Sequence, residues 1–214
     1  MTLSIVAKCA RTRQFGVAAA TEMPAVGKFL SYAFPRYGAF ATQALVNPYL
    51  GIDGCKLLSL SVSAKSTVET VLEDDVRRQE RQIAAVDKEG RSFAFTGEQC
   101  LPFAGSLQGP DFTVQGNRLA GRQVLEAMAE AFEADKGAEL VHRLIAAIAA
   151  GVAAGGDRHG ERSTSVYVVA DEEYPLWDIR VDDHADIVRE LKRLEGVFRE
   201  ELYPHVLAMD SRAR

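Results

Sequence analysis

The order of strand-like and helix-like segments is the feature that most constrains the fold of this chain. Residues 3–8 and 15–21 alternate along the chain and are rich in β-branched and small side chains, which predicts an opening β-hairpin. Two helical patterns then follow one another at 121–133 and 138–154, before the strand pattern returns at 165–170. Strands, a helix pair and further strands predict an α+β fold and argue against a βαβ repeat.

The other expected elements complete this outline. We expect further strands at 37–44, 81–86, 92–96, 112–115 and 177–181, and further helices at 51–60, 63–75 and 188–198. Asn47-Pro48 is expected to stop or turn the chain, and Ser66 or Thr67 to cap the helix at 63–75. No repeat or low-complexity linker interrupts the sequence. We therefore expect one domain over residues 1–214, with a frayed tail from about residue 205.

Composition excludes several classes of protein. The 47% of hydrophobic and 26% of charged residues are ordinary for a globular chain, and the net charge of −5 argues against nucleic-acid binding. The sequence has no run of about 18 apolar residues, which argues against a membrane span. It also lacks a secretory start, and Cys9, Cys55 and Cys100 are odd in number and widely spaced. We expect a cytoplasmic protein with reduced thiols.

The common catalytic motifs are absent from the sequence. It has no Gly-x-Ser-x-Gly elbow, no Walker loop, no His-Glu-x-x-His and no dinucleotide-binding glycine motif. His159 and His184 lie beside Asp157, Asp182 and Asp183, so a metal hydrolase is one hypothesis, though the least favoured of three. We expect no metal and no cofactor.

Thr2 offers hydrolytic chemistry that needs no histidine. An N-terminal Thr supplies a hydroxyl nucleophile and an α-amine with a pKa of about 8, which can accept the hydroxyl proton and return it to a leaving amine. Thr2 becomes such a residue once Met1 is removed, and Thr is small enough for that removal. The alternative is an ordinary residue of the first strand.

Three further stretches carry candidate site residues, each with a structural alternative. Asn117 can donate to an oxyanion or cap a helix. Asp157, in a glycine-rich loop ahead of Ser163, can lie near an ammonium or a substrate, or simply follow the end of a helix. Thr42 and Gln43 can line a pocket or satisfy a loop. We predict that all five belong to the neighbourhood of Thr2.

Eight short stretches resemble one family in their order along the chain. They are residues 2–7, 16–18, 24–27, 41–44, 95–98, 114–117, 155–157 and 180–184. Together they resemble the domain-of-unknown-function 1028 family of the Ntn-hydrolase superfamily, over nearly the whole chain. The resemblance implies a four-layer αββα sandwich, with two antiparallel sheets between helical layers. It also implies Thr2 as nucleophile, Asn117 as oxyanion donor, and Asp157 and Ser163 as pocket residues.

Two functional hypotheses follow. The first is an N-terminal-nucleophile amidohydrolase that acts on a small amide-containing molecule. The second is a non-catalytic domain on the same scaffold that binds a small ligand or a partner protein. Glu22 and Lys28 depart from the pattern expected for the family and are either site charges or surface charges. The helical faces and the Trp177 region leave room for a homodimer, the commonest oligomer.

Overall fold

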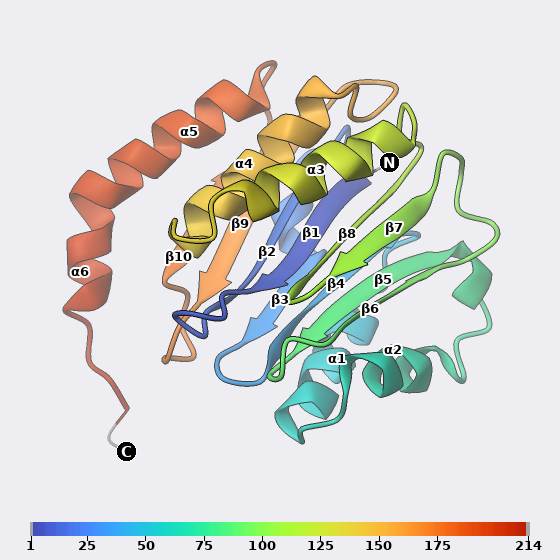
Figure 1. The fold of residues 1–214 in the computed structure, drawn as a ribbon, viewed down its shortest axis with the longest axis horizontal. Helices are drawn as coiled ribbons and strands as arrows, with labels where there is room; N and C mark the ends of the chain where they lie inside the picture. Colours follow the sequence, from blue (N-terminus) through green and yellow to red (C-terminus); the bar gives the residue numbers. More distant parts are fainter. Residues whose placement is uncertain (1, 213–214) are drawn as a thin grey trace.

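The computed structural model describes residues 2–212 and contains a central six-stranded antiparallel sheet (Figure 1). Its strands lie in the order β10-β9-β2-β1-β8-β7, so the first strand of the chain is central. The strands are β1 (Thr2–Lys8), β2 (Phe15–Thr21), β7 (Gly105–Gly109), β8 (Phe112–Asn117), β9 (Ser163–Val169) and β10 (Trp177–Val181).

A four-stranded antiparallel sheet faces the first one. Its order is β3-β4-β5-β6, which follows the sequence. The strands are β3 (Ser31–Phe34), β4 (Gly38–Ala44), β5 (Arg81–Asp87) and β6 (Ser92–Thr96). Strand β1 packs against β4 and β5 of this sheet, and β8 packs against β5. The middle strands of the two sheets therefore face each other.

Helices cover the outer face of each sheet (Figure 1). Helices α1 (Pro48–Ser59) and α2 (Ala64–Leu72) pack on the four-stranded sheet, while α3 (Arg122–Ala134), α4 (Leu140–Ala153) and α5 (Ile187–Val197) pack on the six-stranded sheet. The short turns are η1 (Val26–Lys28), η2 (Arg78–Glu80) and η3 (Phe198–Leu202), and α6 (Tyr203–Leu207) ends the helical part. This arrangement confirms the predicted four-layer αββα sandwich. Within residues 2–212 no helix combines the length and apolar character needed to cross a membrane.

Alternation along β1 shows why the layers stack in this way. Leu3 and Ile5 belong to the apolar cluster beneath α3 and α4, whereas Val6 belongs to the cluster between the two sheets. A third cluster fills the space between the four-stranded sheet and α1–α2. Because successive side chains of a strand point to opposite faces, β1 supplies two of these clusters at once.

The structure corrects two expected helix boundaries. Asn47-Pro48 begins α1 instead of stopping the chain, because the Asn47 side chain caps the backbone N–H of Tyr49 at 3.1 Å and proline suits the first helical turn. Ser63, and not Ser66 or Thr67, caps α2, since its hydroxyl accepts from the backbone N–H of Ser66.

The C-terminal segment packs back onto the sheet. Trp177 is 2% exposed and stacks on Tyr203 at 4.7 Å between ring centroids, with Phe198 at 4.9 Å. The chain's own C-terminal helices therefore cover the Trp177 side chain, and self-association stays a prediction. Helix α6 continues to Leu207, with Val206 buried, and so extends past residue 205, where fraying was expected to begin.

Candidate active site

Thr2 occupies one end of the central strand, within a row of polar side chains. It pairs across the sheet with Asn117, the last residue of β8. On the other side of β1, Leu3 pairs with Ala20 of β2, which places Thr2 opposite Thr21. The Thr2 hydroxyl donates to the Thr21 hydroxyl at 3.3 Å. Thr21 pairs in turn with Ser163. Directly opposed residues share a face of a sheet, so these side chains project between the two sheets.

The loop between α4 and β9 crosses the end of the strand that carries Thr2. At its start, Gly156 accepts from the backbone N–H of Ala120, and Asp157 bridges to Leu119, both just beyond β8. At its end, the backbone N–H of Arg162 donates to the Thr21 carbonyl at 2.7 Å. Because β1 lies between β8 and β2, residues 155–162 span the end of β1. Thr2 is accordingly only 7% exposed.

A charged pair spans the same strand end. Arg118 follows Asn117 and Glu22 follows Thr21, and the two side chains form an ion pair at 3.5 Å. The Arg118 guanidinium also lies 3.5 Å from the His159 ring nitrogen Nε2. Arg118 has a left-handed backbone with φ of 55°, which costs free energy in a residue with a side chain. Glu22 is thus placed beside the end of β1.

Asp157 is a buried carboxylate with one unused oxygen. It is 4% exposed, and its Oδ1 atom accepts from the backbone N–H of His159 at 2.8 Å. Its Oδ2 atom is buried and has no hydrogen-bond partner among the residues that the structure describes. Burial raises the pKa of the Asp157 carboxyl, and also that of Glu161, which accepts from the Asp157 backbone N–H at 2.7 Å. The loop therefore holds, next to the end of β1, a carboxylate oxygen that has no donor among residues 2–212.

This burial predicts a pH-dependent gain in stability from Asp157→Asn in the chain that still carries Met1. A raised pKa means that ionisation of Asp157 costs the folded state free energy, so the wild type loses stability as pH rises through that pKa. The variant avoids this loss, and we expect it to be more stable at pH 7 by roughly 1 kcal/mol. The gain should disappear below about pH 4, where the carboxyl is protonated in both states.

Thermal unfolding of both proteins between pH 3 and 8 measures this effect. Asp210→Asn, which alters an exposed carboxylate, is the matched control and should leave the pH profile unchanged. A variant that is equally or less stable at pH 7 would contradict the expectation for the Met1-bearing chain.

Asn117 belongs to a buried hydrogen-bond network between the sheets. Its Nδ2 atom donates to Gln82 Oε1 at 2.9 Å, and Gln43 Nε2 donates to the same oxygen at 2.7 Å. Gln43 accepts from the Ser4 hydroxyl, which accepts from Gln115, both at 2.6 Å. Four of these side chains are fully buried and Asn117 is 3% exposed. The network fixes the plane of the Asn117 amide and uses one of its two N–H groups.

The other predicted site residues are placed differently. Gln43 lies in the network between the two sheets, the space into which Thr2 also projects. Thr42 precedes Gln43 on β4, so its side chain points to the other face of the four-stranded sheet, toward α1. Its hydroxyl lies 3.4 Å from the Asn47 carbonyl. Ser163 is two strands from Thr2, roughly 10 Å away. Its hydroxyl donates to the Met23 carbonyl and accepts from the Val26 backbone N–H, and so holds the turn after β2.

The residues of the metal hypothesis do not come together. Asp183 pairs with Arg162 at 2.7 Å, and the His184 ring caps the backbone of Asp186. Within residues 2–212 no group of three or more His, Cys, Asp or Glu side chains is placed to hold a metal ion. The structure therefore gives the metal-hydrolase hypothesis no support.

Asn117 is also not the helix cap that was its structural alternative. It ends β8, while α3 begins at Arg122 after Gly121. Sequence reasoning did not single out Thr21, Arg118 or Gln82. Thr21 is the polar last residue of an otherwise apolar strand whose bounds were predicted correctly. That polar strand end was the signal that could have identified Thr21 as a site residue. Arg118 and Gln82 gave no local signal, because their partners are distant in the sequence.

Comparison with known proteins places the chain in a family. A DUF1028 protein of Silicibacter pomeroyi, known from a crystal structure, is 31% identical, with a TM-score of 0.88 over 95% of this chain and 88% of that one. Anbu, an ancestral β-subunit from Yersinia bercovieri, is 10% identical, with a TM-score of 0.45 over 99% of this chain and all of the other. No curated protein matches. A family model described as a family of unknown function, DUF1028, matches residues 2–191, and the chain therefore belongs to this family.

Proposed function

We propose that this protein is an N-terminal-nucleophile amidohydrolase whose nucleophile is the Thr2 hydroxyl, exposed with its amine by removal of Met1. The observation that carries the proposal is the position of Thr2. It begins the central strand, pairs with Asn117, and lies at the strand end crossed by the loop of Asp157. A nucleophile, an amide donor and a buried carboxylate thus lie around one strand end.

The proposed reaction follows from these groups. The α-amine of Thr2 takes the proton of Oγ1 as that oxygen attacks the carbonyl carbon of an amide, and a tetrahedral oxyanion forms. Collapse breaks the C–N bond, and the leaving amine takes the proton from the Thr2 ammonium. Water then attacks the ester on Thr2 by the same proton relay, which releases the acid and restores the hydroxyl.

Asp157 has a specific part in this proposal. Its unused Oδ2 atom accepts a hydrogen bond from the Thr2 ammonium of the processed chain, and so orients the amine toward the hydroxyl. The pairing reverses the stability effect described above, because the carboxylate gains a charged partner. In the chain without Met1, Asp157→Asn is therefore expected to be destabilising at pH 7.

An electrophilic probe tests the assignment of the nucleophile. The full chain, shown by intact mass to lack Met1, is treated with an acylating β-lactone and then mapped by peptide mass spectrometry. We expect one adduct, on Thr2, and none in Thr2→Ala. Thr42→Ala removes a buried threonine hydroxyl from the face of β4 that points toward α1, and this variant should be labelled like the wild type. An unmodified Thr2 would favour the non-catalytic hypothesis, and an adduct on another residue would assign the nucleophile to that residue.

Asn117→Ala is expected to lower kcat by roughly 10²–10³-fold, the usual effect of removing one oxyanion donor. The reason is that the N–H of Asn117 not used by Gln82 is available to an oxyanion formed beside Thr2. KM should change little, since the donor acts on charge that develops after binding. Steady-state kinetics on an amide that the wild type hydrolyses provides the measurement. Asn47→Ala, which removes a distant helix cap, is the control, and a kcat for Asn117→Ala within a few-fold of wild type would contradict the role.

A further inference from the structure

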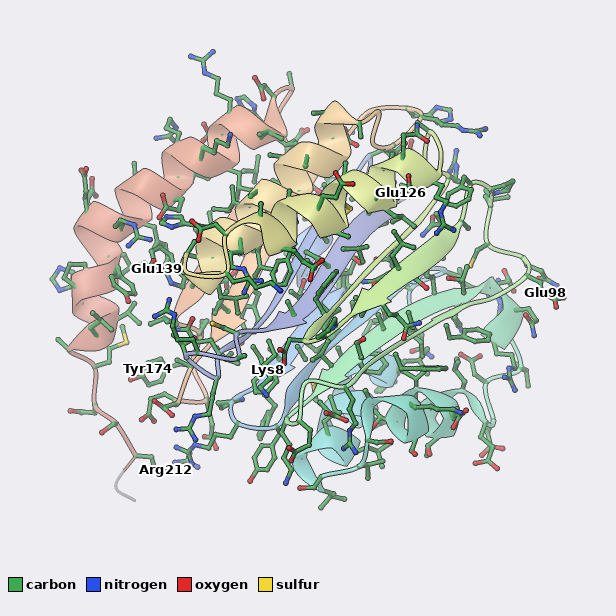
Figure 2. All side chains as sticks on the ribbon, in the orientation of Figure 1. Lys8, Glu98, Glu126, Glu139, Tyr174 and Arg212 are labelled. Atoms are coloured by element: carbon green, nitrogen blue, oxygen red, sulfur yellow. The ribbon has the colours of Figure 1, made fainter. Side chains whose placement is uncertain are left out.

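A cavity lies at the opposite end of the sandwich from Thr2. Its volume is about 320 Å³, and Lys8, the last residue of β1, is part of its wall. Figure 2 shows Lys8 at the end of that strand, close to the turns of the facing sheet. The full lining is Lys8, Arg13, Phe15, Arg36, Lys88, Ala170 and Asp171. The cavity shares no residue with the row of Thr2 and Asn117, and we call it the basic cavity.

Positive side chains from four separate places in the sequence meet in the basic cavity. Lys8 comes from β1, Arg13 from the β1–β2 turn, Arg36 from the β3–β4 turn and Lys88 from the β5–β6 turn. Four cations thus line a cavity that contains a single carboxylate, that of Asp171, in a chain whose net charge is −5. The chain as a whole repels anions, so this local excess of positive charge is a feature of the site.

These cations are only partly neutralised by the protein. The Lys8 ammonium lies 3.8 Å from an Asp111 carboxylate oxygen. Lys88 donates to the neutral Ser61 hydroxyl at 2.9 Å, and Arg36 donates to the Asp171 backbone carbonyl at 3.1 Å. The guanidinium of Arg13 makes no hydrogen bond or ion pair with any residue that the structure describes. Three of the four side chains therefore have no carboxylate partner within that part of the chain.

Both arginines also sit at backbone positions that favour glycine. Arg13 has φ of 59° and Arg36 has φ of 73°, in the left-handed region that residues with a side chain seldom adopt. Such strain persists where the surrounding structure or a function requires that side chain. Two hairpin turns thus keep an arginine where glycine would fit without strain, and both arginines line the same cavity.

We propose that the basic cavity binds a small phosphorylated molecule through its phosphate groups. A guanidinium offers paired N–H donors that match two oxygens of a phosphate, and a lysine ammonium adds a point charge. Two guanidinium and two ammonium groups suit a ligand with several negative charges. Their attraction for such a ligand also offsets its repulsion by the Asp171 carboxylate. The volume admits pyrophosphate or a small phosphate ester, and a polynucleotide is disfavoured by the acidic chain.

Calorimetric titration of the full chain with inorganic pyrophosphate tests this proposal. We expect saturable one-to-one binding that weakens as salt rises, and at least 10-fold weaker binding in Arg13→Gln/Arg36→Gln. Arg13→Gly/Arg36→Gly removes the same charges while relieving the strained turns, and should lose binding equally. We expect the thermal midpoint of this glycine variant to lie at or near the wild-type value, which would show that the loss of binding does not arise from unfolding.

Matched controls separate this site from general charge and from the Thr2 site. Arg189→Gln/Lys192→Gln removes two positive charges from the exposed face of α5 and should bind pyrophosphate like the wild type. Thr2→Ala should also bind normally, because the basic cavity is independent of the proposed hydrolysis. Absence of pyrophosphate binding, or equal affinity of Arg13→Gln/Arg36→Gln and Arg189→Gln/Lys192→Gln for pyrophosphate, would overturn the proposal. Tighter binding of citrate than of pyrophosphate would overturn the choice of phosphate.

Discussion

Replacement of Thr2 by Ala is expected to lower kcat for amide hydrolysis by roughly 10⁴-fold or more, the scale seen when an enzyme loses its nucleophile. The variant keeps the α-amine, the Asn117 amide and the Asp157 carboxylate, so the loss reports the hydroxyl alone. Thr2→Ser keeps the hydroxyl and should retain turnover. It also allows Met1 removal, because Ser is as small as Thr.

The pH dependence of the same reaction tests the proposed base. The free Thr2 amine must be neutral to accept a proton, so kcat/KM should rise with pH and level off as the amine, with an ordinary pKa of about 8, loses its charge. Intact mass and turnover are measured together on each preparation, across a panel of small amides. Activity that survives Thr2→Ala, or activity in a preparation that fully retains Met1, would refute the mechanism.

Replacement of Gln82 by Leu is expected to be the most destabilising of the changes considered, at about 3 kcal/mol or more. Gln82 Oε1 accepts from both Gln43 and Asn117, and its Nε2 atom donates to the Gly116 carbonyl at 2.8 Å. Leu fills a similar volume but leaves these buried groups without partners, at about 1–3 kcal/mol for each. For a chain of this length the thermal midpoint should fall by roughly 6–12 °C.

Differential scanning calorimetry measures this loss, with Gln108→Leu as the control. Gln108 is an exposed glutamine on β7, and its replacement should change stability by no more than about 0.5 kcal/mol. The double variant Gln82→Leu/Gln43→Leu should lose less than the sum of the two single losses, because the second change removes a group that the first left unpaired. Equal effects of Gln82→Leu and Gln108→Leu would show that the network contributes little to stability.

The sequence predicted a strand correctly where the pattern of neighbouring residues was clear, and missed it where that pattern was weak. Phe15–Thr21, Ser92–Thr96 and Trp177–Val181 were predicted with the bounds that the structure shows, since alternation and β-branching are local properties. Strands β3 and β7 were missed. The first has four residues without full burial, and the second begins and ends with glycine, so neither shows a clear pattern.

The candidate site could be predicted only in part for a related reason. Thr2, Asn117 and Asp157 were named from their chemistry and from the family resemblance, and the structure places them around one strand end. Their roles stay predictions. The pairing of Arg118 with Glu22 depends on the strand order β2-β1-β8, which no local pattern encodes.

The burial of Thr2 has a consequence for the order of events during synthesis. Strand β8 and loop 155–162, which enclose Thr2, are translated long after the N-terminus has left the ribosome. An aminopeptidase needs an extended, accessible end, which the nascent chain offers, whereas Thr2 in the folded chain is only 7% exposed. If Thr2 is the nucleophile, as we propose, we expect Met1 to be removed from the nascent chain. We then expect a chain that folds before Met1 is removed to keep Met1.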